Sequence, residues 1–99
     1  MNNAPRTNVR LVKRHNPRVV HCKREPYDVL IDRTTEWGNP YVIGPDGDRS
    51  DVIRKYRQWI ESFPHKKRII REKLRGKVLG CWCAPRACHG DVLLEIANE

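Results

Sequence analysis

Residues 77–91 read KVLGCWCAPRACHGD, and the fold we expect is built outward from this stretch. Cys81 and Cys83 are two positions apart, so a strand here would turn both thiols to the same face. Pro85 ends such a strand because proline has no backbone N–H to donate and its φ angle is fixed. The letters CHGD then lead into the apolar helical pattern of residues 92–97. The stretch therefore predicts a strand, a short loop and the N-terminus of a helix.

The cysteines and the histidine of this stretch leave three interpretations open. The first is a Cys3His zinc site formed by Cys81, Cys83, Cys88 and His89, since thiolate and imidazole are preferred zinc ligands. The second is an anion site or an activated thiolate at a helix N-terminus, with Cys88 or Cys83 as nucleophile and His89 as acid or base. In this site we expect a thiolate at Cys88 and a protonated thiol at Cys81. In the third, Cys81 and Cys83 simply pack as small apolar residues.

The composition indicates a small, basic, single-domain protein. Its 99 residues include 20 Lys and Arg against 12 Asp and Glu, a formal net charge of +8. This charge favours a polyanionic partner, either nucleic acid or a nucleotide phosphate, although a merely solvated basic surface also explains it. No apolar run approaches the roughly 20 residues of a membrane span, and no signal peptide is visible. We therefore expect a soluble cytoplasmic protein that does not enter membranes, with reduced or metal-bound rather than disulfide-bonded cysteines.

The first third of the chain contains short strand patterns. Residues 1–17 are expected to form a mobile basic leader, although residues 8–13 alternate weakly like a strand. Residues 18–99 are expected to form one domain. It opens with RVVHC at residues 18–22 and YDVLIDR at residues 27–33, whose β-branched and alternating apolar residues predict two strands.

A loop and a helix follow these strands. RTTEWGNPYVIG, residues 33–44, is rich in aromatic and turn residues, so it is a candidate functional loop, unless Trp37 and Tyr41 only pin it to the core. Asp48 or Ser50 can cap the next helix. Apolar residues recur at helical spacing from residue 51 to residue 63, which predicts an amphipathic helix there.

A second, strongly basic helix is predicted for residues 65–76, opened by Pro64 and ended by Gly76. Its outer face suits phosphate contacts without sequence readout, and a solvated helix face is the equally weighted alternative. The cations of this face are Lys66, Lys67, Arg68, Arg71, Lys73 and Arg75.

The order of these elements predicts an α/β domain, with a short mainly parallel or mixed sheet covered by about three helices. Carboxyl ends of parallel strands share one edge of a sheet, so the WGNP loop and the cysteine loop are expected to meet there and bind a ligand. The residues expected to contact that ligand are Arg33, Trp37, Asn39, His89, Gly90 and Asp91.

Several segments together resemble the DUF4326 family, small proteins of bacteria and their phages. They are VVHCKREPYDVLIDR, EWGNPYVIG, DVIRKYRQWI and LRGKVLGCWCAPRACHGDVLLEIAN, within residues 18–98. GCWCAPRACHGDVL is the most specific block and WGNP the second, whereas the leader and Cys22 lie outside the family pattern. The resemblance implies that the two motifs meet in space, and it names no substrate.

Three function classes remain open at this point. The first is a module that binds nucleic acid or a nucleotide phosphate at the two loops, steered there by the basic helix. The second is an enzyme acting on a nucleotide or nucleic acid through Cys88 and His89. The third is a phage-type protein that binds a host factor. Zinc is the one cofactor that the sequence suggests.

Overall fold

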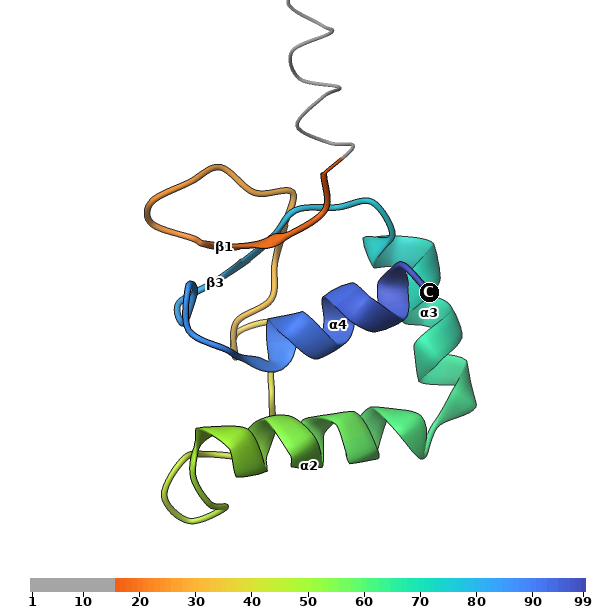
Figure 1. Ribbon diagram of the computed structural model, residues 1–99. Coiled ribbons are helices and arrows are strands. Elements are labelled where there is room, and N and C mark those ends of the chain that lie inside the picture. Colours follow the sequence, from red (N-terminus) through yellow and green to blue (C-terminus); the bar gives the residue numbers. More distant parts are fainter. Residues whose placement is uncertain (1–15) are drawn as a thin grey trace, which may run out of the picture.

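The computed structural model describes residues 16–99, so the expected leader and the weak strand pattern of residues 8–13 lie almost wholly outside the described part. The described chain contains three strands and three helices (Figure 1). In chain order they are β1 (Val19–His21), β2 (Val29–Leu30), α2 (Arg49–Glu61), α3 (Pro64–Leu74), β3 (Leu79–Cys81) and α4 (His89–Ala97).

The three strands form one parallel sheet in the order β1-β3-β2. The register places Leu79 of β3 opposite Val19 of β1 and Val29 of β2. Every residue of β3 is buried, as expected for the middle strand of a parallel sheet. The helices lie on one side of this sheet (Figure 1), which confirms the predicted α/β class.

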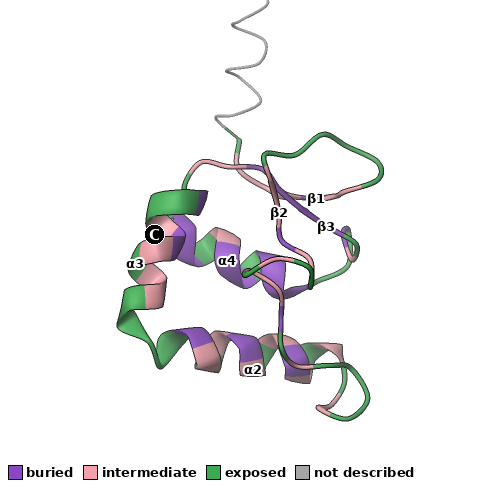
Figure 2. Ribbon diagram, turned by 180° about the vertical axis from the view of Figure 1, so that it is seen from behind, coloured by how far each residue is buried: buried purple, intermediate pink, exposed green. Residues whose placement is uncertain are grey.

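Helix α4 occupies the centre of the domain. It contacts β1 and β3 on one side and α2 and α3 on the other, and its apolar residues Val92, Leu93, Ile96 and Ala97 are all buried, as predicted (Figure 2). Even this apolar helix has only 9 residues, and no helix within residues 16–99 is long and apolar enough to cross a membrane.

The helix boundaries follow from their capping residues. Helix α2 begins at Arg49 rather than residue 51, because the Asp48 side chain accepts a hydrogen bond from the backbone N–H of Asp51 and completes a capping box. Pro64 opens α3, as predicted. Helix α4 begins at His89, three residues before the apolar pattern of residues 92–97, since Cys88 takes the N-cap position.

All three strands are shorter than their sequence patterns, and β1 covers only Val19–His21 of residues 18–22. Only Val29–Leu30 of the segment 27–33 is strand, and β3 stops at Cys81 instead of Cys83. Beyond Leu30, the Ile31 N–H still donates to the Gly80 carbonyl at 2.9 Å, but the strand pairing ends there. The polar residues that follow β2 and β3 therefore lie at the end of the sheet.

Candidate functional site

A cavity of about 260 Å³ opens at the carboxyl ends of β2 and β3, and we call it the strand-end cavity. Its walls come from the segment after β2, the WGNP loop, the start of α2, the loop after β3 and the first residue of α4. The polar and sulfur-bearing residues that matter most here are Arg33, Asn39, Arg49, Cys83, Cys88 and His89. The two sequence motifs therefore meet in space, more than forty residues apart in the chain.

Not all predicted ligand residues line this cavity. Trp37 lines a different hollow beside Trp59, where its carbonyl accepts the hydroxyl of Tyr56 at 2.8 Å. Gly90 is buried, and a Cβ there would come within 2.8 Å of the Ile31 side chain. The Asp91 carboxylate accepts the backbone N–H of Cys88 at 3.0 Å and so caps α4. These three residues act in the fold rather than in the wall of the cavity.

Arg33 and Asn39 fix the WGNP loop against α2. The Arg33 guanidinium donates to the backbone carbonyl of Asn39 and, at 3.0 Å, to that of Tyr41. The Asn39 amide donates to the Val52 carbonyl at 3.1 Å, and its side-chain oxygen accepts the Tyr41 N–H at 2.9 Å. Asn39 is only 6% exposed, so these buried hydrogen bonds define the shape of this wall.

Cys81 and Cys88 form a thiol pair in the wall of the cavity. Their sulfur atoms are 3.3 Å apart, and the residues are 1% and 4% exposed. The hydrogen bond from Cys88 lowers the pKa of Cys81 to about 6, helped by backbone N–H groups of Cys83 and Ala84 and opposed by burial. Donating that hydrogen bond, together with burial, raises the pKa of Cys88.

This order of pKa values is the reverse of the one expected from the sequence, which placed the thiolate at Cys88. The helix N-terminus does contribute one N–H to Cys88, that of Gly90 at 3.3 Å. For Cys81, the Cys88 side chain and the backbone N–H groups of Ala84 and Cys83 all act to lower the pKa. The pKa is lowered more at the sulfur with more donors, and these donors are not visible in the residue spacing.

His89 links α4 to the end of β2. Its Nε2 lies 2.6 Å from the Ile31 carbonyl, which can only accept, so Nε2 carries the proton in the neutral ring. The His89 and Tyr56 rings pack edge to face, with their centroids 5.2 Å apart. Burial lowers the pKa of His89 and outweighs the Ile31 hydrogen bond. His89 is therefore a neutral imidazole near pH 7, with Nδ1 as its remaining acceptor.

The predicted zinc ligands do not form a coordination sphere in this conformation. Within residues 16–99, no group of three or more His, Cys, Asp and Glu side chains is arranged to hold a metal ion. Nε2 of His89 is engaged by the Ile31 carbonyl, so only Nδ1 of this residue could bind a metal. The zinc site stays a prediction, which elemental analysis of the purified protein will test.

The site also contains residues that the sequence did not single out. Arg49 donates to the Ala87 carbonyl at 3.1 Å and thereby ties the start of α2 to the cysteine loop. The Trp82 indole N–H donates to the Asp32 carboxylate at 3.1 Å. Hydrogen bonds from Thr34 and Trp82 lower the pKa of Asp32. Neither Arg49 nor Trp82 stands out in the sequence, because the partners that hold them, Ala87 and Asp32, are distant in the chain.

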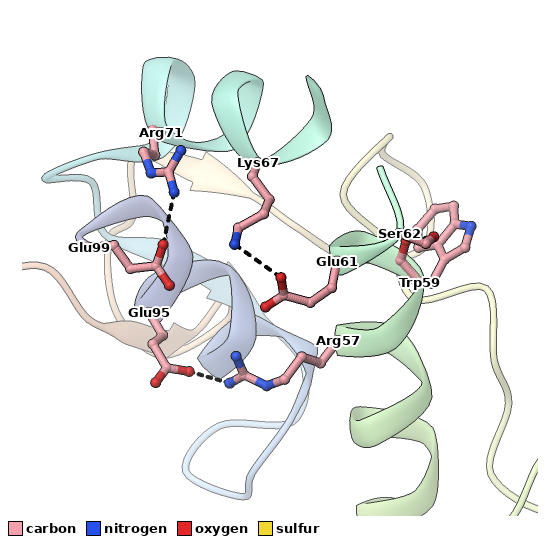
Figure 3. A network of polar contacts seen from close by, with 8 residues as sticks. All are labelled: Arg57, Trp59, Glu61, Ser62, Lys67, Arg71, Glu95 and Glu99. Carbon is pink, nitrogen blue, oxygen red and sulfur yellow. Dashed lines mark hydrogen bonds and ion pairs between the residues drawn. The ribbon is translucent and has the colours of Figure 1, made fainter. Parts of the chain in front are cut away.

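The cations of α3 form ion pairs with neighbouring helices (Figure 3). Lys67 lies 3.0 Å from the Glu61 carboxylate at the end of α2, and Arg71 lies 2.9 Å from the Glu99 carboxylate beyond α4. These side chains are partly exposed, so each pair contributes little to stability. The carboxylates nevertheless partly neutralise the positive charge of Lys67 and Arg71, on the face of α3 that was predicted to bind nucleic acid.

Other α3 cations are engaged as well. The Lys66 ammonium lies 4.3 Å from the centroid of the Trp59 ring, and Arg75 donates to the carbonyl of Ala97 at 3.0 Å. Among the described residues, Arg68 and Lys73 have no hydrogen-bonding or ion-pair partner for their side chains. The binding of nucleic acid by this helix stays a prediction, and it now depends mainly on these two residues.

The fold and the motifs place the chain in a family. Residues 12–99 match the family described as domain of unknown function DUF4326, and the chain belongs to it. A protein of Enterobacteria phage T4, described as an uncharacterized 12.4 kDa protein in the nrdA-td intergenic region, is 40% identical over 86 residues. The match covers 83% of this chain and 78% of the phage protein. No solved structure matches the chain.

Proposed function

We propose that the protein binds a nucleotide or nucleic-acid phosphate at the strand-end cavity. The observation that carries this proposal is the convergence of two guanidinium groups, Arg33 and Arg49, on one cavity at the carboxyl ends of parallel strands. Ligands of open α/β sheets bind at this edge. Guanidinium groups are well suited to phosphate because they offer several N–H donors in a planar fork.

The other walls of the cavity suit the rest of a nucleotide. Backbone carbonyls occupy only some of the donors of Arg33 and Arg49, which leaves donors for a phosphate. Ile43, Val52 and Ile53 supply an apolar wall against which a base ring can pack. The remaining acceptor of neutral His89 suits an N–H of a base. A phosphate at the guanidinium groups and a base against the apolar wall would satisfy all three surfaces.

Calorimetric titration with nucleoside mono-, di- and triphosphates, and with inorganic phosphate alone, tests this proposal. Arg49→Gln should weaken nucleotide binding about tenfold or more, because it removes a charge-assisted hydrogen bond. Arg54→Gln is the matched control, since Arg54 lies on the same helix but pairs with Asp51 outside the cavity. The proposal is wrong if no nucleotide binds at low salt, or if both variants weaken binding equally.

The thiol pair favours a second candidate, an enzyme that acts on the bound nucleotide. Cys81 lines the cavity, is held close to Cys88 and has a lowered pKa, so Cys81 would be the nucleophile rather than Cys88. Prolonged incubation with each nucleotide that binds, followed by chromatography of the products, distinguishes turnover from binding. Turnover should be lost in Cys81→Ser. If the nucleotide is unchanged in every incubation, the protein binds it without catalysis.

A further inference from the structure

A second hollow adjoins the strand-end cavity, and we call it the Trp82 groove. Its volume is about 420 Å³. It shares Arg49, Trp82 and Cys83 with the cavity, so the two spaces adjoin at these residues. Its other charged residues are Arg24 and Arg86, and none of its described lining residues is acidic. The groove is therefore a basic channel that leads from the mouth of the cavity.

The Trp82 ring is exposed and yet held in a fixed orientation. It is 53% exposed, the highest value among the exposed large hydrophobic residues of the described chain. Its N–H is fixed by the Asp32 carboxylate, His21 meets the ring at 5.8 Å, and the Lys23 ammonium lies 5.4 Å from the ring centroid. Lys23 lies over the ring and Asp32 binds its edge, so the surface open to a base is the exposed part of the indole that neither Lys23 nor the core covers. Such an aromatic surface is suited to stacking with a base.

The cations of the groove differ from those of α3. Within residues 16–99, the side chains of Arg24 and Arg86 have neither a hydrogen bond nor an ion pair. Both residues are exposed, so their guanidinium groups are available to a ligand. They come from the loop after β1 and from the cysteine loop, which are far apart in sequence and lie together only in the fold.

We propose that the Trp82 groove binds single-stranded nucleic acid. One base stacks on Trp82, the adjoining phosphates lie along Arg24, Arg49 and Arg86, and the next base enters the strand-end cavity. This inference rests on the proposed function for the cavity and extends it from a nucleotide to a strand. The strand must be single because a paired and stacked base can neither cover the indole nor enter the cavity.

Fluorescence anisotropy with labelled single-stranded DNA and RNA, and with a duplex of the same sequence, tests this inference at several salt concentrations. Single strands should bind more tightly than the duplex. Trp82→Ala should weaken binding of the single strand about tenfold through the loss of stacking, and Trp82→Phe should restore part of it. Replacing both Arg24 and Arg86 by Gln should reduce the slope of log K against log salt by about 1.4, since each phosphate contact contributes about 0.7.

The matched control replaces Arg68 and Lys73 by Gln, which removes the same charge from the α3 surface. It should leave the affinity and the salt slope close to wild type. If this control weakens binding as much as the Arg24 and Arg86 double variant, the groove is not the binding surface. Equal affinity for duplex and single strand, or an unchanged affinity in Trp82→Ala, would also overturn the inference. Circular dichroism of every variant checks that the fold is intact.

The two proposals fail in different ways. If nucleotide binding depends on Arg49 but the affinity for oligonucleotides is unchanged by Trp82→Ala, the groove proposal is overturned and the cavity proposal stands. If oligonucleotides depend on Trp82, Arg24 and Arg86 while no nucleotide binds, the cavity proposal is overturned and the groove remains as a stacking surface. If the wild-type protein binds neither nucleotides nor oligonucleotides, both proposals are wrong.

Discussion

The two basic surfaces of this protein differ in what their cations do. Helix α3 has the denser charge in sequence, yet Lys67 and Arg71 are paired with carboxylates of neighbouring segments (Figure 3). The Trp82 groove has fewer cations, and Arg24 and Arg86 have no such partners within the described chain. A run of cations in sequence therefore does not measure the charge available to a ligand. What matters is how many of them the fold leaves unpaired.

The same two ends of the molecule differ in their neutral hydrogen bonds. At the strand-end cavity, the Asn39 side chain bonds Val52 and Tyr41 from a buried position. At the α3–α4 end, the exposed side chain of Asn98 makes a similar pair, accepting from the Gly76 N–H at 3.1 Å and donating to the Leu94 carbonyl at 2.9 Å. Water can replace the second pair but not the first, so the first should contribute more to stability.

The largest effect expected from this comparison is on stability. Asn39→Ala should lower the free energy of unfolding by about 1–3 kcal/mol, because buried partners are left unsatisfied. Asn98→Ala is the matched control and should cost less than about 1 kcal/mol. Urea denaturation followed by circular dichroism measures both. If both substitutions lower the free energy of unfolding equally, burial does not explain a difference in stability between the two ends.

A second prediction concerns thiol accessibility. Cys83 lines both the cavity and the groove, whereas Cys22, also partly exposed, lines neither. A nucleotide or oligonucleotide at ten times its Kd should slow alkylation of Cys83 about tenfold by occupancy and leave Cys22 unaffected. Mass spectrometry of peptides after timed iodoacetamide treatment measures each site. Equal protection of both cysteines, or of neither, would argue against a ligand at this end.

Acidification should weaken the strand end before it affects the α3 ion pairs. Burial, with the positive charge of Arg33, lowers the pKa of His89 below its ordinary value of 6.5, and Asp91 and Asp32 only partly oppose this. As the pH falls through about 6.5, the unfolded chain binds a proton that the folded chain does not, so stability falls. The melting temperature should therefore drop between about pH 7.5 and pH 5.5.

His89→Gln should reduce this pH dependence, because an amide keeps a donor for the Ile31 carbonyl and does not titrate. His65→Gln is the control, since His65 lies on the exposed start of α3. A wild-type pH dependence in His89→Gln would assign the effect to another group.

The smallest effect is expected at the α3 end. A double-mutant cycle that combines Arg71→Gln and Glu99→Gln should give a coupling free energy close to zero, because both side chains are more than a third exposed. The coupling should shrink further in high salt. A coupling as large as the effect of Asn39→Ala, measured by urea denaturation, would mean that this surface is more rigid and less solvated than its exposure implies.

Much of the fold was predictable because its signals are local. The apolar spacing of residues 92–97 identified the central helix, and the Asp48 cap and Pro64 identified helix starts. The strands were predicted at the right places but too long. Their length depends on pairing partners, which the alternation of residues does not reveal. The meeting of the WGNP and cysteine loops followed from the parallel order of the strands.

The sequence by itself determined the element order, the α/β class and the residues of two motifs, because periodicity, caps and turns act between near neighbours. Only the tertiary structure decided which side chains became free, paired or charged. Arg49 and Trp82 are held by Ala87 and Asp32, each distant in the chain, and the contacts of Cys81 with Cys88 and nearby backbone N–H groups lower the pKa of Cys81. Charge availability and thiol ionisation depend on through-space donors and burial, which residue spacing alone does not specify.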